Sequence, residues 1–240
     1  MASASTDLAE LATRGLVARA GAGTAARERT LPLLPVFGEL LPGAVLQRGS
    51  VVGCHGAAAV SLALSLAAGP SQQGAWVAVV GLPMLGLAAA AEAGVVLHRL
   101  VAVVEPADDP CSDSLWADLL AACIDGFDVV VLGPGTQQVR PATARRLVAR
   151  LQARGAVALA VGAPVFGADL RFEAITQTWA GLGQGHGVAQ GRRVEVSLSG
   201  RRVPQARRTE WWLPAADGAV RPVEPAAQQP PVVVPLRRTG

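Results

Sequence analysis

One short stretch of the sequence has the residue types of a phosphate-binding strand–loop–helix. Residues 51–69 read VVGCHGAAAVSLALSLAAG, which is a β-branched run, then glycines, then an apolar segment typical of a helix. In such a loop, backbone N–H groups hold the phosphates of a nucleotide, a lysine reaches the β- and γ-phosphates, and a hydroxyl binds Mg²⁺. The stretch carries no full charge, so this chemistry has to be tested position by position.

The loop lacks the side chains that hold a nucleotide. If Gly53 is the first glycine of G-x-x-x-x-G-K-[ST], Ala58 stands at the second glycine, Ala59 at the lysine and Val60 at the hydroxyl. All 21 basic residues of the chain are arginines. No shift of register can therefore supply a lysine, and the residues 53–60 are predicted to form a degenerate nucleotide loop with Gly53, Cys54, His55 and Gly56 at its start.

Two further positions lack the groups that hydrolysis needs. Gly133 stands after the apolar run VVVL, where a metal-binding acid is expected. Leu82 and Pro83 follow the run WVAVVG, where an acid or polar group should position the attacking water. Three independent losses predict that NTP hydrolysis is absent and that neither a cofactor nor a metal is bound.

One weaker alternative is open at the loop. The N–H groups of Gly56 and Ala57 at the start of a helix could still hold an anion without a lysine, with His55 contributing. Against this, His55 can be read as an ordinary residue of a surface loop.

Short apolar strands alternate with helices through the middle of the chain. The pattern predicts strands at 50–53, 76–81, 100–104, 128–133 and 157–161, and helices at 57–68, 85–93, 113–124 and 141–153. Segments 172–182 and 193–198 then alternate polar and apolar residues like antiparallel edge strands, and a hairpin over 209–223 turns at Asp217-Gly218. The expected fold is α/β, a mostly parallel twisted sheet flanked by helices, with antiparallel C-terminal strands.

The ends of the chain, its uncharged stretch and its cysteines indicate what kind of protein this is and where it is located. Asp7 and Glu10 predict a capped helix over about 8–20, and the tail from Glu224 has a disordered composition. The uncharged stretch 49–91 is broken by Gly and Pro and is read as buried core, not as a membrane span. Three widely spaced cysteines, with no apolar leader, predict buried reduced thiols and a cytoplasmic location.

In order and spacing, the parts of this chain resemble the RecA family. They are LPGAVLQRGSVVGCHGAAAVSLALSLAA, WVAVVG, AAAEAGVVLHRLVAVV, the helix before FDVVVLG, and RRVEVSLSGRR. The resemblance covers about residues 31–203, which we expect to form a RecA-like core between a segment 1–30 and a C-terminal segment 204–240. It is most specific for the RecA-like accessory proteins of the bacterial translesion-synthesis mutasome, the ImuA-type group of high-G+C actinobacteria. The positions that depart from the family are those of nucleotide chemistry: Ala58, Ala59, Val60, Pro83 and Gly133.

The resemblance implies a non-enzymatic function in DNA repair. It implies an SOS-induced adaptor, a pseudo-NTPase, that binds an ImuB-type Y-family polymerase homologue. Through that partner it would work with an error-prone replicative-type polymerase and the sliding clamp. The alternative is a RecA-fold regulator that binds single-stranded DNA or RecA directly. A remnant enzyme on a Rossmann-like sheet ranks last, because no G-x-G-x-x-G follows the first strand.

Contact residues are expected in the C-terminal part. Trp211 and Trp212 are neighbours on a strand, so they point to opposite sides, and one of them can contact a partner. From residue 190 onward, the sequence contains nine arginines and four acidic residues. Paired arginines there could contact DNA phosphates independently of sequence, or an acidic partner, or could simply be solvated: Arg192, Arg193, Arg201, Arg202, Arg207 and Arg208. The acidic loop with Asp108, Asp109 and Asp113 is read as a polar turn and helix cap, not as a metal site.

Overall fold

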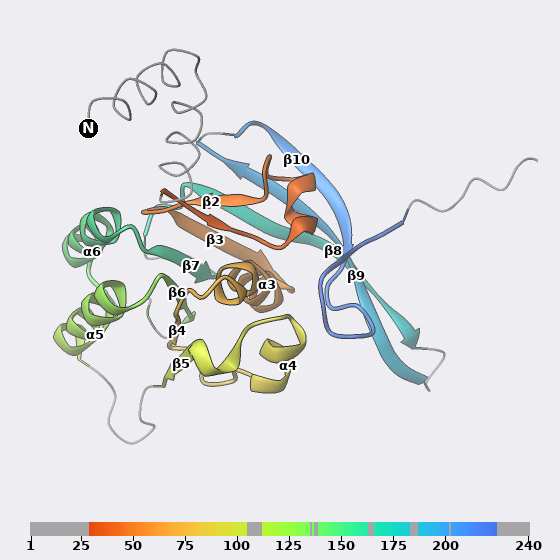
Figure 1. Cartoon of the computed structure of the whole chain (residues 1–240), viewed down its shortest axis with the longest axis horizontal. Coiled ribbons are helices and arrows are strands. Elements are labelled where there is room, and N and C mark those ends of the chain that lie inside the picture. Colours follow the sequence, from red (N-terminus) through yellow and green to blue (C-terminus); the bar gives the residue numbers. More distant parts are fainter. Residues whose placement is uncertain are drawn as a thin grey trace, which may run out of the picture.

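One mixed sheet organises the molecule, and the order of its strands differs from their order in the chain (Figure 1). The structure is a computed structural model that describes residues 29–104, 112–134, 136, 139–162, 166–182, 187–201 and 203–224. Among these residues, nine strands form one sheet in the order β11-β10-β9-β8-β3-β7-β6-β4-β5. The predicted N-terminal helix and C-terminal tail, with Asp108, Asp109, Cys111 and Arg202, lie outside the described residues.

The predicted parallel half of the sheet is confirmed. Its strands contain no Asp, Glu or Arg, and most of their residues are buried, because helices cover both faces of the sheet. They are β3 (Val51–Gly56), β4 (Val77–Val80), β5 (Leu100–Val103), β6 (Val129–Leu132) and β7 (Val157–Val161). Each pairing between neighbours in this group is parallel.

Two layers cover the parallel half (Figure 1). Helices α3 (Ala59–Gln72) and α4 (Leu87–Glu92) share one apolar core with the short helix η1 (Pro35–Glu39) and the hairpin of β1 (Thr30–Pro32) and β2 (Val45–Gln47). Helices α5 (Asp113–Gly126) and α6 (Pro141–Arg154) bury their apolar faces in a second core on the opposite face. Helix α6 begins at Pro141, where the predicted helix 141–153 begins and where proline is favoured in a first turn. The 3-10 turn η2 (Leu97–Arg99) leads into β5.

The antiparallel half is built from the strands after residue 169. Strand β8 (Leu170–Leu182) is parallel to β3 on one side and antiparallel to β9 (Gly187–Gly200) on the other. Strands β10 (Val203–Trp212) and β11 (Arg221–Pro222) complete the sheet. The sheet therefore continues past residue 203, where the sequence suggested that the core ends. The predicted hairpin is present, with a turn in which Gly218 N–H donates to Ala215 O.

Two local predictions are wrong. Helix α3 does not end at residue 68 but runs through Gly69 and Pro70 to Gln72. A side chain at position 69 would overlap the backbone of Leu33 and Leu34, so glycine there lets the β1–η1 segment pack directly on the helix. In α5 the regular spacing of Leu115, Leu119 and Ala122 predicts an apolar stripe that begins at Leu115, but Leu115 is exposed and Trp116 is fully buried.

Candidate functional site

The predicted nucleotide loop is mostly a strand. Strand β3 continues to Gly56, pairing Gly53 with Ala160 and Arg171 and Gly56 with Ala174. Only residues 57 and 58 connect it to α3. The predicted end of the strand at residue 53 is therefore wrong: Gly53, Cys54 and His55 lie in the sheet ladder, where their backbone groups pair with neighbouring strands. A two-residue connection does not supply the run of free N–H groups with which a phosphate-binding loop surrounds its ligand.

His55 lies on the face of the sheet opposite to α3. Side chains alternate along a strand, and Val52 and Cys54 belong to the core that contains α3, whereas Val51 belongs to the other core. A Cβ at Gly53 would lie 2.6 Å from His55 Nε2, so the imidazole leans back over that glycine. Burial lowers the pKa of His55, the charge of Arg171 lowers it further, and Glu173 opposes the shift. His55 therefore leans away from the helix start, and binding of an anion by the N–H groups of Gly56 and Ala57 stays a prediction.

The first turn of α3 is occupied by an arginine from a distant strand. Arg192, on β9, is 8 % exposed. Its guanidinium donates to Ser61 Oγ at 2.9 Å, to Leu213 O at 2.7 Å and to Ala57 O at 3.4 Å, and it stacks on the ring of Trp179, 5.3 Å from its centroid. The guanidinium that reaches this turn is therefore held by protein groups.

The positions of the missing lysine and hydroxyl differ in their surroundings. Ala58 and Ala59 are buried in the core under α3, whereas Val60 is partly exposed. A lysine at position 59 would direct its ammonium group into apolar surroundings, where an unpaired charge is costly. The geometry at the start of α3 has been adapted to small apolar side chains.

The position of the missing metal-binding acid is closed by backbone. Gly133 follows β6, and its N–H donates to Val80 O at 2.8 Å across to β4. A Cβ at Gly133 would overlap the carbonyl oxygen of Gly81 and approach Leu82 N at 2.9 Å. Thr136 Oγ1 also donates to Gly133 O at 2.8 Å, which fixes the turn. No side chain, acidic or otherwise, fits at position 133 without moving the ends of β4 and β6.

Each arginine pair on β9 and β10 is divided between the two faces of the sheet. Arg192 is buried, so it does not form the surface contact predicted for it. Arg207, on the same face, donates to Leu40 O at 2.9 Å. On the other face, Arg193 pairs with Glu210 and Arg208 with Glu195. The alternation of a strand thus prevents a continuous basic stripe here, and contact of Arg193, Arg201, Arg207 or Arg208 with DNA or an acidic partner stays a prediction.

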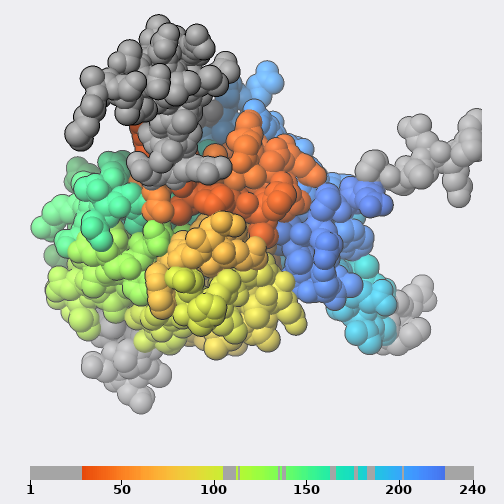
Figure 2. Space-filling view, viewed as in Figure 1, coloured from red at the N-terminus to blue at the C-terminus, as the bar shows by residue number. Residues whose placement is uncertain are grey.

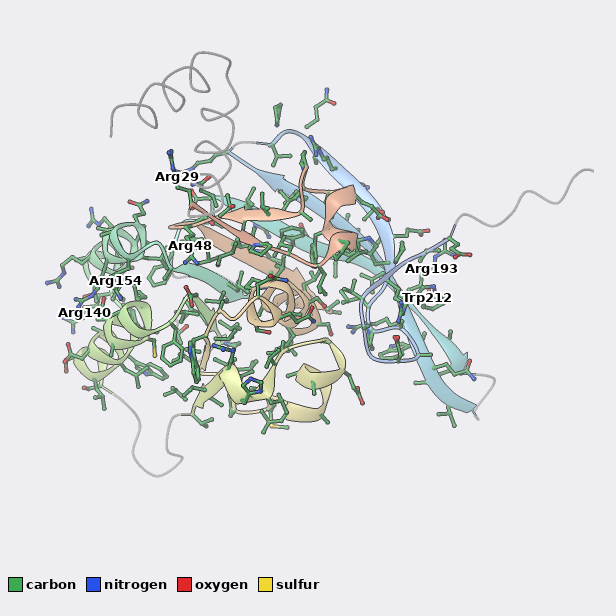
Figure 3. All side chains as sticks on the ribbon, in the orientation of Figure 1. Arg29, Arg48, Arg140, Arg154, Arg193 and Trp212 are labelled. Atoms are coloured by element: carbon green, nitrogen blue, oxygen red, sulfur yellow. The ribbon has the colours of Figure 1, made fainter. Side chains whose placement is uncertain are left out.

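The two tryptophans point to opposite sides, as predicted. Trp211 is fully buried, packs edge-on against Phe37 with ring centroids 5.1 Å apart, and donates from Nε1 to Glu39 Oε2 at 2.8 Å. Trp212 is half-buried and lies opposite Arg193 in the β9–β10 register, and both are labelled in Figure 3. Partner contact can therefore involve Trp212 but not Trp211.

Trp212 lines a groove that the sequence did not reveal. The groove has a volume of about 500 Å³ and lies between the distal part of the β8–β9 hairpin and the turn after β10. In Figure 2 the blue segment after β10 lies beside the cyan part of the chain. Its walls are mostly small residues, with charges at one end: Ala180, Gln190, Gly191, Ala215, Ala216, Asp217 and Arg221. Only the contact between hairpin and turn creates it, so no sequence spacing could have predicted it.

Comparison with known proteins places the parallel half in a family. The model of the MT3502 N-terminal domain matches residues 39–166, which is more than half of the chain. This chain belongs to the MT3502 N-terminal domain family. A relative described as the uncharacterized protein Rv3395c, from Mycobacterium tuberculosis (strain ATCC 25618 / H37Rv), is 36 % identical over 148 residues, covering 59 % of this chain and 70 % of the relative.

The MT3502 N-terminal domain contains the closed nucleotide positions but not the contact candidates. Residues 53–60 and Gly133 lie inside the matched range 39–166, whereas Arg192 and Trp212 lie beyond it.

A second pocket, of about 640 Å³, is larger than the groove beside Trp212. It lies near the amino ends of β3 and β8 and is lined by Arg48, Arg201 and Arg207 among others. Among the described residues, no helix is long and apolar enough to span a membrane.

Proposed function

We propose that this protein is a non-catalytic, RecA-like adaptor in SOS-induced mutagenic translesion DNA synthesis. In this proposal it binds an ImuB-type Y-family polymerase homologue and hydrolyses no nucleotide. The observation that carries the proposal is the contact between Gly133 and Gly81, because it closes the position of the metal-binding acid within an otherwise intact strand–helix framework. An unused site that had merely lost one side chain would have left a space.

Two further features support an adaptor over an enzyme. The first turn of α3 holds the internal arginine Arg192, which donates to Ser61 Oγ and two carbonyls. The start of the helix therefore has a cation fixed by the protein instead of a free lysine. The framework keeps its packing on both faces of the sheet, so it can present a binding surface without nucleotide chemistry.

The surface that we assign to the polymerase homologue is the groove beside Trp212. Tryptophans and arginines are enriched at the energetic centres of protein interfaces, and this groove has a half-buried tryptophan beside Arg221 and Asp217. The ion pairs Arg193–Glu210 and Arg208–Glu195 neutralise the adjacent sheet face. That neutral face favours a protein partner over a nucleic acid, whose binding depends on unpaired positive charge.

Binding of the purified chain to the polymerase homologue tests the proposal. We expect a complex in co-purification and calorimetry, and we expect Trp212→Ala to weaken it by at least about tenfold, as truncation of a central tryptophan does. Trp76→Ala is the matched control, because Trp76 is also partly exposed but lies at the start of β4, far along the sheet. Equal effects of the two substitutions would remove the groove from the proposal.

Measurements of nucleotide and DNA binding distinguish the proposal from its alternatives. Saturable, Mg²⁺-dependent ATP binding by the native protein would overturn the pseudo-NTPase assignment. Salt-dependent binding of single-stranded DNA, without binding of the polymerase homologue, would favour the direct regulator instead. Both measurements need only the full chain and a fluorescent ligand.

A further inference from the structure

The pocket at the amino ends of β3 and β8 has the size of a ligand site. Its volume of about 640 Å³ lies within the range of roughly 300–1,000 Å³ that small-molecule sites have. It is enclosed by the β1–β2 hairpin, the segment that leads into β3 and the β9–β10 turn. The degenerate nucleotide loop follows the opposite, carboxyl end of β3, so the two regions are separate.

Part of the pocket lining is aliphatic. Leu41, Val45, Leu170 and Val203 are partly buried and line the pocket. No aromatic ring is among the described residues that line it, so a nucleobase would find no ring on which to stack. The lining therefore favours a ligand with an aliphatic body over a nucleotide.

The charged side chains of the lining carry a positive excess. They are Arg48, Asp169, Arg201 and Arg207. Arg48, labelled in Figure 3, pairs with Asp128 at 3.0 Å. Among the described residues, no carboxylate pairs with Arg201 or Arg207. Apart from the Arg48 pair, the pocket thus has two positive side chains and one negative one, and a ligand with a single negative charge would balance them.

The fold holds these charged groups in place. Arg207 Nη1 donates to Leu40 O at 2.9 Å, and Leu40 also lines the pocket. Asp169 Oδ2 accepts from Val51 N at 2.9 Å, and Arg201 N–H donates to Asp169 O at 3.1 Å. A guanidinium that is anchored at one nitrogen keeps further N–H donors, and paired N–H donors fit the two oxygens of a carboxylate.

We propose that this pocket binds a small carboxylate with an aliphatic body. Arg201 and Arg207 bond the carboxylate, and the aliphatic part lies against Leu170 and Val203. Asp169 disfavours a ligand with several negative charges, because it lies in the same pocket. The proposal does not depend on binding of the polymerase homologue, since no residue lines both this pocket and the groove beside Trp212.

Calorimetry with simple carboxylates tests the class of ligand. The probes are butanoate, octanoate and dodecanoate, added to the full native chain. We expect saturable binding of octanoate or dodecanoate. We expect binding at least tenfold weaker for octanol, which lacks the charge, and for inorganic phosphate, which lacks the aliphatic body. The proposal is overturned if none of the three carboxylates binds saturably, or if octanol binds as tightly as octanoate.

Substitution of the two arginines locates the site. Arg201→Gln and Arg207→Gln should each weaken binding of the carboxylate by about tenfold or more, because each removes a charge-assisted hydrogen bond. Arg208→Gln is the matched control, because Arg208 is on the same strand as Arg207 but pairs with Glu195 on the other face of the sheet. Native affinity in both Arg201→Gln and Arg207→Gln would overturn the proposal.

Substitution of the acid should have the opposite effect. Asp169→Asn keeps an oxygen that can accept from Val51 N–H but removes the negative charge from the pocket. Binding of the carboxylate should therefore become severalfold tighter, and weaker binding in a folded Asp169→Asn would contradict the proposed charge balance. Thermal unfolding without ligand separates lost binding from lost folding, and the exposed Arg201 carries the test if Arg207→Gln is unstable.

Discussion

The parallel and antiparallel halves of this sheet use their residues in different ways. In the parallel half, glycines such as Gly133 and Gly56 stand where the backbone of a neighbouring strand leaves no room for a side chain. In the antiparallel half, charged side chains alternate with buried ones, and arginines such as Arg193 and Arg208 pair with glutamates across the strands. In the first half, contacts of backbone with backbone leave no room for a side chain at these positions. The second half presents polar surface, a tryptophan and a groove.

This difference separates a closed framework from an exposed sheet face. A closed backbone contact cannot regain a binding function by a single substitution, whereas an exposed sheet face can change its partners one side chain at a time. The boundary between the halves is bridged by Arg192, which belongs to β9 but bonds at the first turn of α3. The two halves therefore have separate surfaces but are expected to unfold together. Substitutions in either half should change the free energy of unfolding of the whole molecule.

The largest loss of stability is expected in the antiparallel half, for substitution of Trp211. Trp211→Ala removes a fully buried ring that contacts Phe37 and Glu39, and it should lower the free energy of unfolding by about 3–5 kcal/mol. Trp212→Ala should cost less than half of that, because this ring is only half-buried. Urea denaturation of both variants checks this, and similar losses would contradict the division of the two rings between the faces.

The next largest loss of stability is expected in the parallel half, where Gly133 packs against Gly81. Gly133→Ala places a methyl group against Gly81 O and should lower the free energy of unfolding by about 1–3 kcal/mol, as other overpacked sites do. Gly126→Ala is the control, because a Cβ at Gly126 meets nothing within 4 Å. If Gly133→Ala were as stable as the control, the closure of the acid position would be refuted.

The bridging arginine should differ from its neighbour on the same strand. Arg192→Met leaves Leu213 O and Ala57 O without their buried donor and should cost about 1–3 kcal/mol. Arg193→Met removes only a half-exposed ion pair with Glu210 and should cost less than about 1 kcal/mol. Thermal and urea unfolding of the two variants measure the difference, and a larger loss for Arg193→Met would be contrary to this assignment.

A buried thiol in β3 should make stability fall at alkaline pH. Burial raises the pKa of Cys54 from 9.0 to about 12. Above pH 9 the unfolded chain releases this proton while the folded chain retains it, so the free energy of unfolding falls as the pH rises toward 12, by about 1.4 kcal/mol per pH unit. The chain has no tyrosine and no lysine, so few other groups titrate in that range.

Cys54→Ala should flatten this pH dependence. The measurement is urea unfolding at several pH values between 9 and 11, comparing slopes instead of absolute stabilities, because the substitution also removes buried atoms. Burial raises the pKa of Cys123 as well, so some slope should remain. An unchanged slope in Cys54→Ala would mean that the thiol is not protonated by burial.

Most of the framework could be predicted from residue patterns. Uncharged β-branched runs such as VALAV bury both faces of a strand, and their alternation with helices predicts a parallel sheet without further information. The boundaries were less reliable at glycines. Gly53 and Gly69 were read as breaks in their elements, yet one lies inside a strand and the other inside a helix. A sequence does not distinguish a glycine needed for a turn from one needed for close packing.

The sequence by itself determined that no lysine of this chain can stand beside a phosphate, because the chain contains none. It also determined that Trp211 and Trp212 point apart, since successive side chains on a strand must alternate. Only the tertiary structure decided which ring is buried, that Arg192 reaches Ser61 and that Gly133 meets Gly81. These are contacts between segments far apart in the chain. They depend on strand order and register, which no local pattern of residues encodes.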